Sequence, residues 1–237
     1  MSRASTESLS LYITPEHPCG YLPERMARTV FVDPELAMDS RLYSLLAVHG
    51  FRRNGPNVYK PHCENCQACV PLRVAVEEFS PDRGLQRVWK RNQDLAVRTL
   101  PAESRPEHYA LYKRYLASRH AGGGMDGSGE EEYAHFLTCP WGRSRMVEMR
   151  AGGALVAVAV MDELDEALSA VYTFYEPELP RRSLGTYAVL WQIAEARRRG
   201  LKWLYLGYWI AASRKMAYKD RFRPHETLGP GGWARVE

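Results

Sequence analysis

The stretch Arg145–Tyr175, RMVEMRAGGALVAVAVMDELDEALSAVYTFY, decides the fold of this chain. Its three strand candidates, 145–150, 154–161 and 167–175, are separated by two glycines and by the acidic turn DELDE. Short runs rich in β-branched and aromatic residues, bounded by turn signals, are typical of β-strands. Because connections this short join antiparallel neighbours, the stretch predicts a three-stranded antiparallel meander.

Helical patterns flank the meander. Residues 106–119 carry an apolar stripe, and 130–137 have acids in their first turn. After the meander, 183–199 has helical apolar spacing and 201–207 is a strand candidate. This order of two helices, three strands, a helix and a strand resembles the core of the GCN5-related N-acyltransferase (GNAT) fold, a similarity that fixes no substrate.

The first hundred residues predict a smaller, cysteine-containing unit. Asp39 is a candidate helix N-cap, Asn54-Gly55 is a hairpin turn signal, 70–76 reads as a strand and 83–95 as a basic helix. Turn residues in 100–106 mark a junction. We therefore expect a mixed α+β chain with two domains: residues 1–103, which contain the cysteines, and residues 104–237, a GNAT-like catalytic domain with a mostly antiparallel sheet.

Composition is that of an ordinary globular protein, with 237 residues, 45% of them apolar and 25% charged. The longest apolar run, 154–161, is far shorter than the roughly 20 residues of a membrane helix. The N-terminus lacks a basic-then-apolar signal pattern. These features predict a cytoplasmic protein that has no membrane partner.

The net charge of +4 is unevenly distributed. Residues 181–223 hold eleven Lys or Arg against two acids, and 83–119 hold nine Lys or Arg. Aromatic residues are mixed into both stretches. Clustered cations with interleaved rings suit a phosphate backbone and unstacked bases, although solvated helix faces would give the same pattern residue by residue.

The first candidate site joins a strand to a helix at Arg181-Arg182-Ser183-Leu-Gly185. We expect Ser183 to cap the helix and Gly185 to let a ligand approach the backbone. Free N–H groups and the positive helix end would then bind an anion together with Arg181 and Arg182. The alternative is a plain capped core helix.

The second candidate site follows the last strand of the core. Lys215, Lys219, Arg221 and Arg223 form a dense cationic segment there, which could converge on a carboxylate or phosphate or could be a solvated loop. If the reaction is acyl transfer to an amine, Arg221, Arg223 or Lys219 could bind an acidic acceptor, and we favour Arg221 and Arg223. A neighbouring hydroxyl could stabilise the oxyanion or relay a proton. The residues that we single out as catalytic candidates are Tyr208, Tyr218 and Lys219.

The third candidate site is a set of cysteines. Cys63, Cys66 and Cys69 follow a C-x-x-C-x-x-C spacing, and Cys19 lies far upstream. Four thiols could bind zinc or an iron–sulfur cluster, between which the spacing does not choose. Reduced thiols lining a small core are the alternative, and Cys139 stands apart.

With these residues in view, the sequence resembles the arginyl/leucyl-tRNA–protein transferase family, and within it the short bacterial branch of aspartate/glutamate leucyltransferases. The resemblance runs through nearly the whole chain. The segments that carry it are Pro18–Pro23, Gly50–Arg53, Tyr59–Cys63, Cys66–Pro71, Tyr112, Tyr115, Arg119-His120, Phe136-Leu137, Val171–Pro177, Arg182–Tyr187, Tyr205–Ile210, Lys215–Lys219 and Arg223-Pro224.

The resemblance implies an enzyme that transfers leucine from leucyl-tRNA, its co-substrate, to proteins with N-terminal Asp or Glu, and so marks them for the N-degron degradation machinery. It implies no required cofactor. Leu22 and Val70 stand where the eukaryotic arginyl branch has cysteines, so the iron–sulfur ligands of that branch cannot be carried over one by one. Three alternatives remain: arginine as the transferred residue, a coenzyme A-dependent acetyltransferase, and a metal-stabilised RNA-binding module without catalysis.

Overall fold

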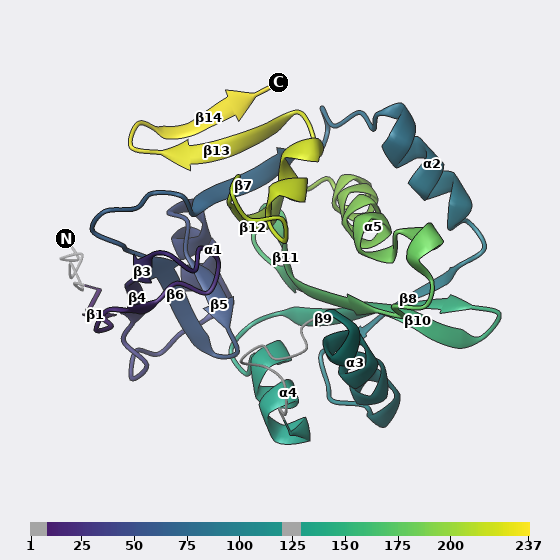
Figure 1. Cartoon of the computed structure of the whole chain (residues 1–237), viewed down its shortest axis with the longest axis horizontal. Coiled ribbons are helices and arrows are strands. Elements are labelled where there is room, and N and C mark those ends of the chain that lie inside the picture. Colours follow the sequence, from purple (N-terminus) through teal and green to yellow (C-terminus); the bar gives the residue numbers. More distant parts are fainter. Residues whose placement is uncertain (1–8, 120–128) are drawn as a thin grey trace, which may run out of the picture.

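The computed structural model describes residues 9–119 and 129–237, so His120 and residues 1–8 lie outside it. An eight-stranded sheet of order β14-β13-β7-β12-β11-β10-β9-β8 forms the body of the molecule. Every neighbouring pair in it is antiparallel except β11 with β12. The sheet curves around helix α5, which lies on its concave side (Figure 1). The prediction of a mixed α+β chain with a mostly antiparallel sheet is therefore confirmed.

The meander forms as expected. Its strands are β9 (Ser144–Ala151), β10 (Ala154–Glu163) and β11 (Ala167–Tyr175). Side chains alternate between the two faces of β10, so that Ala157 and Ala159 join one apolar cluster while Val158 and Val160 join another. Burial of β10 on both faces explains its nearly continuous apolar sequence.

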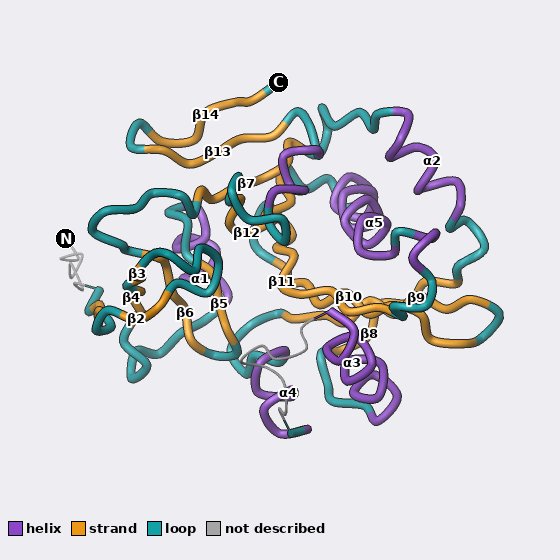
Figure 2. Tube along the Cα trace, in the orientation of Figure 1, coloured by secondary structure: helices purple, strands orange, loops and turns teal. Residues whose placement is uncertain are grey.

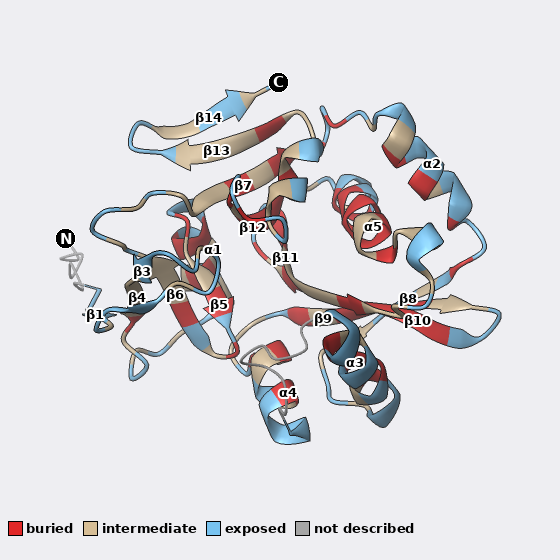
Figure 3. Ribbon diagram, in the orientation of Figure 1, coloured by how far each residue is buried: buried red, intermediate tan, exposed pale blue. Residues whose placement is uncertain are grey.

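Helices cover both faces of the meander. Helix α5 (Leu184–Arg198) packs on one face, and α2 (Arg83–Arg91) lies against α5. Helices α3 (Pro106–Arg119) and α4 (Glu130–Leu137) belong to the cluster on the other face. Figure 3 shows that α5 is buried along most of its length, whereas α4 exposes one side. None of the helices in the described residues is long and apolar enough to cross a bilayer.

The N-terminal region builds a second, four-stranded sheet of order β1-β4-β6-β5, which lies beside the large one (Figure 2). The predicted hairpin forms from β5 (Arg52–Asn54) and β6 (Asn57–Pro61), and its turn, Gly55-Pro56, lies one residue after the predicted Asn54-Gly55. Helix α1 (Ser40–Val48) begins after Asp39, whose carboxylate accepts a hydrogen bond from the Leu42 N–H at 2.7 Å. The remaining elements are β1 (Leu11–Ile13), β2 (His17–Pro18), β3 (Met26–Ala27), β4 (Thr29–Val32), the 3-10 helices η1 (Pro180–Arg182) and η2 (Ala217–Arg221), β13 (His225–Gly229) and β14 (Gly232–Val236).

Two strands from the first hundred residues belong to the large sheet. Strand β7 (Val70–Ala75) lies between β12 and β13, and β8 (Ala96–Pro101) pairs with β9 at the far edge. The expected basic helix therefore ends at Arg91, and part of the expected junction is a strand. The boundary between residues 103 and 104 stays a prediction.

The parallel pair at the centre of the large sheet separates early. Strands β11 and β12 (Trp203–Trp209) are paired only from Ala167 with Trp203 to Ser169 with Tyr205. Beyond these residues β12 continues along β7 after a register shift, while β11 continues along β10. The two strands leave a split in the sheet, and the candidate site residues after β12 begin beside it.

Candidate functional site

Lys219, on η2, is a buried cation with 7% of its surface exposed. Its Nζ donates a hydrogen bond to the Tyr208 carbonyl oxygen at 2.7 Å. The described residues offer it no carboxylate partner. Burial and the positive charge of Arg52 lower the pKa of Lys219 to about 7, against an opposing effect of Cys69. A buried lysine in this state can accept a proton near neutral pH.

Arg52, on β5, reaches from the N-terminal sheet into the split between β11 and β12. Its Nη1 donates to the Ser169 hydroxyl at 2.8 Å, and its Nη2 donates to the Ala170 carbonyl oxygen. On the β12 side the guanidinium lies against Gly207, where a Cβ would stand 3.0 Å from the Arg52 Nε. Gly207 also has a φ of 74°, so both its backbone and its lack of a side chain make room for Arg52.

The two candidate tyrosines of this region differ in environment. Tyr208, on β12, is 3% exposed, and its hydroxyl donates to the Gly50 carbonyl oxygen at 2.8 Å. This bond commits the hydroxyl proton to the backbone. Tyr218 is 47% exposed, yet burial by the surrounding protein raises the pKa of its hydroxyl. Tyr218 thus keeps part of its side chain open to water.

Residues of the N-terminal region lie beside Tyr208, whose ring centroid is 6.3 Å from that of Tyr59. Burial raises the pKa of Tyr21 to about 12, although 39% of its surface is exposed, and Tyr59 is close enough to raise that pKa further. The charge of Arg52 acts on the pKa of each of the surrounding groups, which identifies it as the shared neighbour. We call this set the Arg52 cluster; it comprises Tyr21, Arg52, Tyr59, Tyr208, Tyr218 and Lys219.

The start of α5 differs from the anion site that the sequence predicts, both at the cap residue and at the arginines. Ser183 occupies the N-cap position in a left-handed conformation with φ 53°, and its side chain makes no capping hydrogen bond. Arg182 pairs with both carboxylate oxygens of Asp94, at 2.9 and 2.8 Å. Arg181 is exposed. A Cβ on Gly185 would lie 3.1 Å from the Tyr175 ring, so glycine is needed there for packing.

The basic segment after β12, residues 215–223, places its cations in different environments. Arg221 pairs with Asp82 at 3.4 Å, and Arg223 pairs with Asp220 at 2.6 Å. Lys215 is exposed. The segment therefore does not bring all its charges to one point; Lys219 alone among these four turns inward.

The four predicted metal ligands approach one another without forming a ligand set. Cys19, Cys63 and Cys66 each raise the pKa of Cys69, which burial brings to about 12. Nevertheless, no three His, Cys, Asp or Glu residues in 9–119 and 129–237 are placed so as to hold a metal ion. As placed, these thiols do not fit zinc or an iron–sulfur cluster, and no step proposed below involves one. Cys139 is separate and buried.

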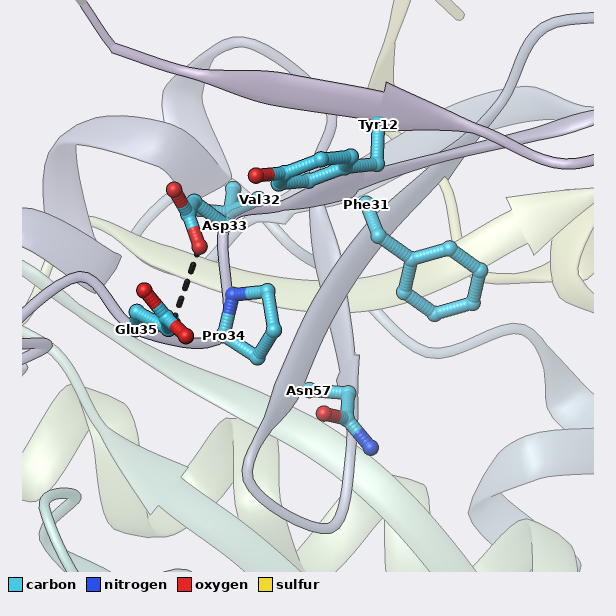
Figure 4. Close-up of a pocket in the computed structure, with 7 residues that line it drawn as sticks. All are labelled: Tyr12, Phe31, Val32, Asp33, Pro34, Glu35 and Asn57. Carbon is cyan, nitrogen blue, oxygen red and sulfur yellow. Dashed lines mark hydrogen bonds between the residues drawn. The ribbon is translucent and has the colours of Figure 1, made fainter.

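A surface hollow of about 430 Å³ lies on the N-terminal sheet (Figure 4). It is lined by Tyr12, Phe31 and the turn that follows β4, where the Asp33 carboxylate accepts a hydrogen bond from the Glu35 N–H at 2.9 Å. It shares no residue with the Arg52 cluster. Because it contains neither a buried cation nor a nucleophile, we assign the chemistry to the Arg52 cluster.

Sequence reasoning did not single out Arg52, Tyr21 or Tyr59. All three stand in the segments that carry the family resemblance, Pro18–Pro23, Gly50–Arg53 and Tyr59–Cys63. That resemblance was the available signal. What it could not supply is the placement of these segments against β12, which depends on contacts distant in sequence.

Comparison with known proteins covers nearly the whole chain. The family models for the N terminus and the C terminus of arginine-tRNA-protein transferase match residues 17–87 and 107–229. The aspartate/glutamate leucyltransferase of Thiobacillus denitrificans is 50% identical over 98% of this chain and 96% of its own. That of Marinobacter nauticus is 49% identical over 98% of each.

Similarity to solved structures is much lower. L-PGS from Bacillus licheniformis aligns with a TM-score of 0.49 and 14% identity, covering 67% of this chain and 57% of that one. The family is assigned on the sequence comparisons alone. Two family models that together match most of the chain, and relatives of about half-identical sequence along its whole length, agree: the chain belongs to the arginine-tRNA-protein transferase family.

Proposed function

We propose that this protein transfers leucine from leucyl-tRNA to the α-amine of proteins that begin with Asp or Glu. The observation that carries the proposal is the near-complete match to relatives named aspartate/glutamate leucyltransferase, at 44–50% identity. The Arg52 cluster supports it, because it combines a buried lysine of lowered pKa with an arginine that has no carboxylate partner among the described residues and lies beside a split in the sheet.

The chemistry requires little covalent help from the protein. The α-amine nitrogen attacks the ester carbonyl carbon, a C–N bond forms, and the C–O bond to the tRNA ribose breaks. The amine loses a proton, and the departing ribose oxygen gains one. An α-amine has a pKa of about 7.7–8, so an ionised amine can pass its proton to a base whose pKa is near 7. We assign that base to Lys219.

The two tyrosines take different parts in this proposal. Tyr218 is partly exposed and has a hydroxyl that can donate to the developing oxyanion. Tyr208 positions Lys219, since its carbonyl oxygen accepts the Lys219 hydrogen bond and its hydroxyl holds the Gly50 loop. We propose that the exposed cations, Arg181 and those of the basic segment such as Lys215, contact the phosphate backbone of the tRNA.

The test incubates the protein with radiolabelled leucyl-tRNA or arginyl-tRNA and with peptides beginning with Asp, Glu or Lys. Leucine should appear on the Asp and Glu peptides and not on the Lys peptide. Transfer from arginyl-tRNA alone would replace leucine by arginine as the donor residue, the alternative favoured by the description of the matching family models. Binding of acetyl-CoA without any transfer from tRNA would contradict the proposal.

The biological role belongs to the same proposal. An added leucine changes the N-terminal residue of the acceptor, and we propose that the product is read by the N-degron degradation machinery in the cytoplasm. Comparing the half-life of an Asp-starting reporter protein in cells with and without this chain tests that step. An unchanged half-life would contradict it.

A further inference from the structure

We infer that Arg52 is the residue that recognises the acidic side chain of the acceptor. This inference rests on the proposed function and adds the specificity-determining contact to it. The two cations that sequence reasoning favoured for that contact, Arg221 and Arg223, already pair with Asp82 and Asp220. Arg52 has no carboxylate partner among the described residues.

The hydrogen-bond inventory of Arg52 leaves room for a carboxylate. A guanidinium has five N–H donors, arranged so that two of them can contact both oxygens of one carboxylate. The contacts that the structure gives to Arg52 go to two acceptors, the Ser169 hydroxyl and the Ala170 carbonyl oxygen. Both acceptors are neutral. The arginine is thus held in place at the split while its charge stays uncompensated.

The position of Arg52 also meets the geometric demand of the reaction. One methylene group separates the carboxylate of Asp from its α-carbon, and two separate that of Glu. The residue that binds this carboxylate must therefore stand beside the amine that reacts. Arg52 meets the demand, since its guanidinium lies against Gly207, and the carbonyl oxygen of the next residue, Tyr208, accepts the hydrogen bond of Lys219, the proposed base.

Binding of the acidic side chain at Arg52 also changes the base. The charge of Arg52 is one of the causes that lower the pKa of Lys219. A carboxylate bound to Arg52 offsets that charge, so the pKa of Lys219 rises and the lysine accepts a proton more readily. An Asn or Gln side chain has no charge with which to do this.

The experiment measures binding of Asp- and Asn-starting peptides by calorimetry, with the full chain, for wild type and for Arg52→Gln. Wild type should bind the Asp peptide about tenfold or more tightly than the Asn peptide, and Arg52→Gln should bind both alike. The matched control is Arg41→Gln, on the exposed side of α1, which should keep the wild-type preference. Retention of the full preference by Arg52→Gln would overturn the assignment.

Two further measurements keep the inference testable. Arg52→Lys keeps a positive charge but cannot contact two carboxylate oxygens at once, so it should reduce the preference about threefold or more. If Arg52→Gln does not fold, an unreduced preference in Arg52→Lys overturns the assignment instead. In leucine transfer, Arg52→Lys should leave leucyl-tRNA affinity unchanged; equal loss with Asp and Asn peptides would identify Arg52 as a structural link only. A wild type that prefers the Asp peptide but transfers no leucine would contradict the proposed function and leave the binding assignment standing.

Discussion

We expect Lys219 to make the stability of the protein depend on pH. Its folded-state pKa of about 7 lies below the ordinary value of 10.5. Between these two values the unfolded chain binds more protons than the folded one, so this group makes stability rise with pH across that window. Below about pH 7 the penalty for burying the charged lysine is fully present.

The prediction compares wild type with Lys219→Met between pH 7 and 9.5. The difference in unfolding free energy should shift in favour of wild type as pH rises, by up to about 1.4 kcal/mol for each unit of pH. Denaturant titrations at several pH values measure it. Leucine transfer by wild type should increase through pH 7, and Lys219→Met should lose that increase. A pH-independent stability difference would show that Lys219 does not titrate in this range.

Tyr208 and Tyr218 form a matched pair of tests. Tyr208→Phe leaves the Gly50 carbonyl oxygen without its partner, so it should cost about 1–3 kcal/mol of stability. Tyr218→Phe, at an exposed position, should change stability by less than about 0.5 kcal/mol and lower kcat. Thermal unfolding and peptide kinetics separate the two. Unchanged kcat in Tyr218→Phe would exclude its hydroxyl from the reaction.

Single residues were only partly predictable. The density of cations after β12 identified the segment that contains Lys219, but not that Lys219 alone turns inward there. Arg52 and Arg53 are neighbours on β5, and successive strand residues point to opposite faces. Arg53 is buried against Asp162 at 2.7 Å, whereas Arg52 enters the split. Which of two adjacent arginines faces the site depends on where the strand is docked.

At the scale of elements, the start of α5 tests how a helix end and its arginine act together. Arg182 is held by Asp94, which lies after α2. We predict that Arg182→Gln lowers leucyl-tRNA affinity several-fold and makes its salt dependence shallower by about one charge. Asp94→Asn should leave the affinity equal or higher, because it frees the arginine. Filter binding over a salt series measures both. Equal losses of affinity in the two variants would mean that the ion pair only joins the segment after α2 to the start of α5.

The strands were predictable where their pattern was local. The runs 145–150, 154–161 and 167–175 correspond to β9, β10 and β11 within a few residues. Strand β8 was missed because it is an edge strand with Arg98 and Pro101, features that protect an exposed edge and also read as a loop. Ser183 was expected to cap α5, but its left-handed backbone prevents the usual cap geometry.

At the scale of the whole molecule, the positive charge of residues 181–223 is partly neutralised by ion pairs. Of the eleven cations in 181–223, at least six pair with acids, and some of these acids come from other segments. Those six are Arg182, Arg198, Arg199, Lys202, Arg221 and Arg223. Composition alone could not show this, and neither could it show that β7 enters the large sheet, since both depend on contacts between distant parts of the chain.

This neutralisation sets the expected salt dependence of tRNA binding. Nine net charges in contact with phosphate would give a slope of about −6 to −8 in a plot of log affinity against log salt. With six of the cations paired, we expect a slope of about −2 to −4. Titrations between low and physiological salt measure it. A slope near zero would argue against a phosphate-binding surface.

The central claim is that leucine is joined to the α-amine of acidic acceptors. Its most direct measurement is mass spectrometry of four peptides after incubation with leucyl-tRNA and the protein: one beginning with Asp, one with Glu, one with Asn, and the Asp peptide with an acetylated α-amine. We predict that leucine is attached at the N-terminus of the Asp and Glu peptides, and that the Asn and acetylated peptides stay unchanged. Leucine on the acetylated peptide, or no leucine on any of the four, would contradict the account.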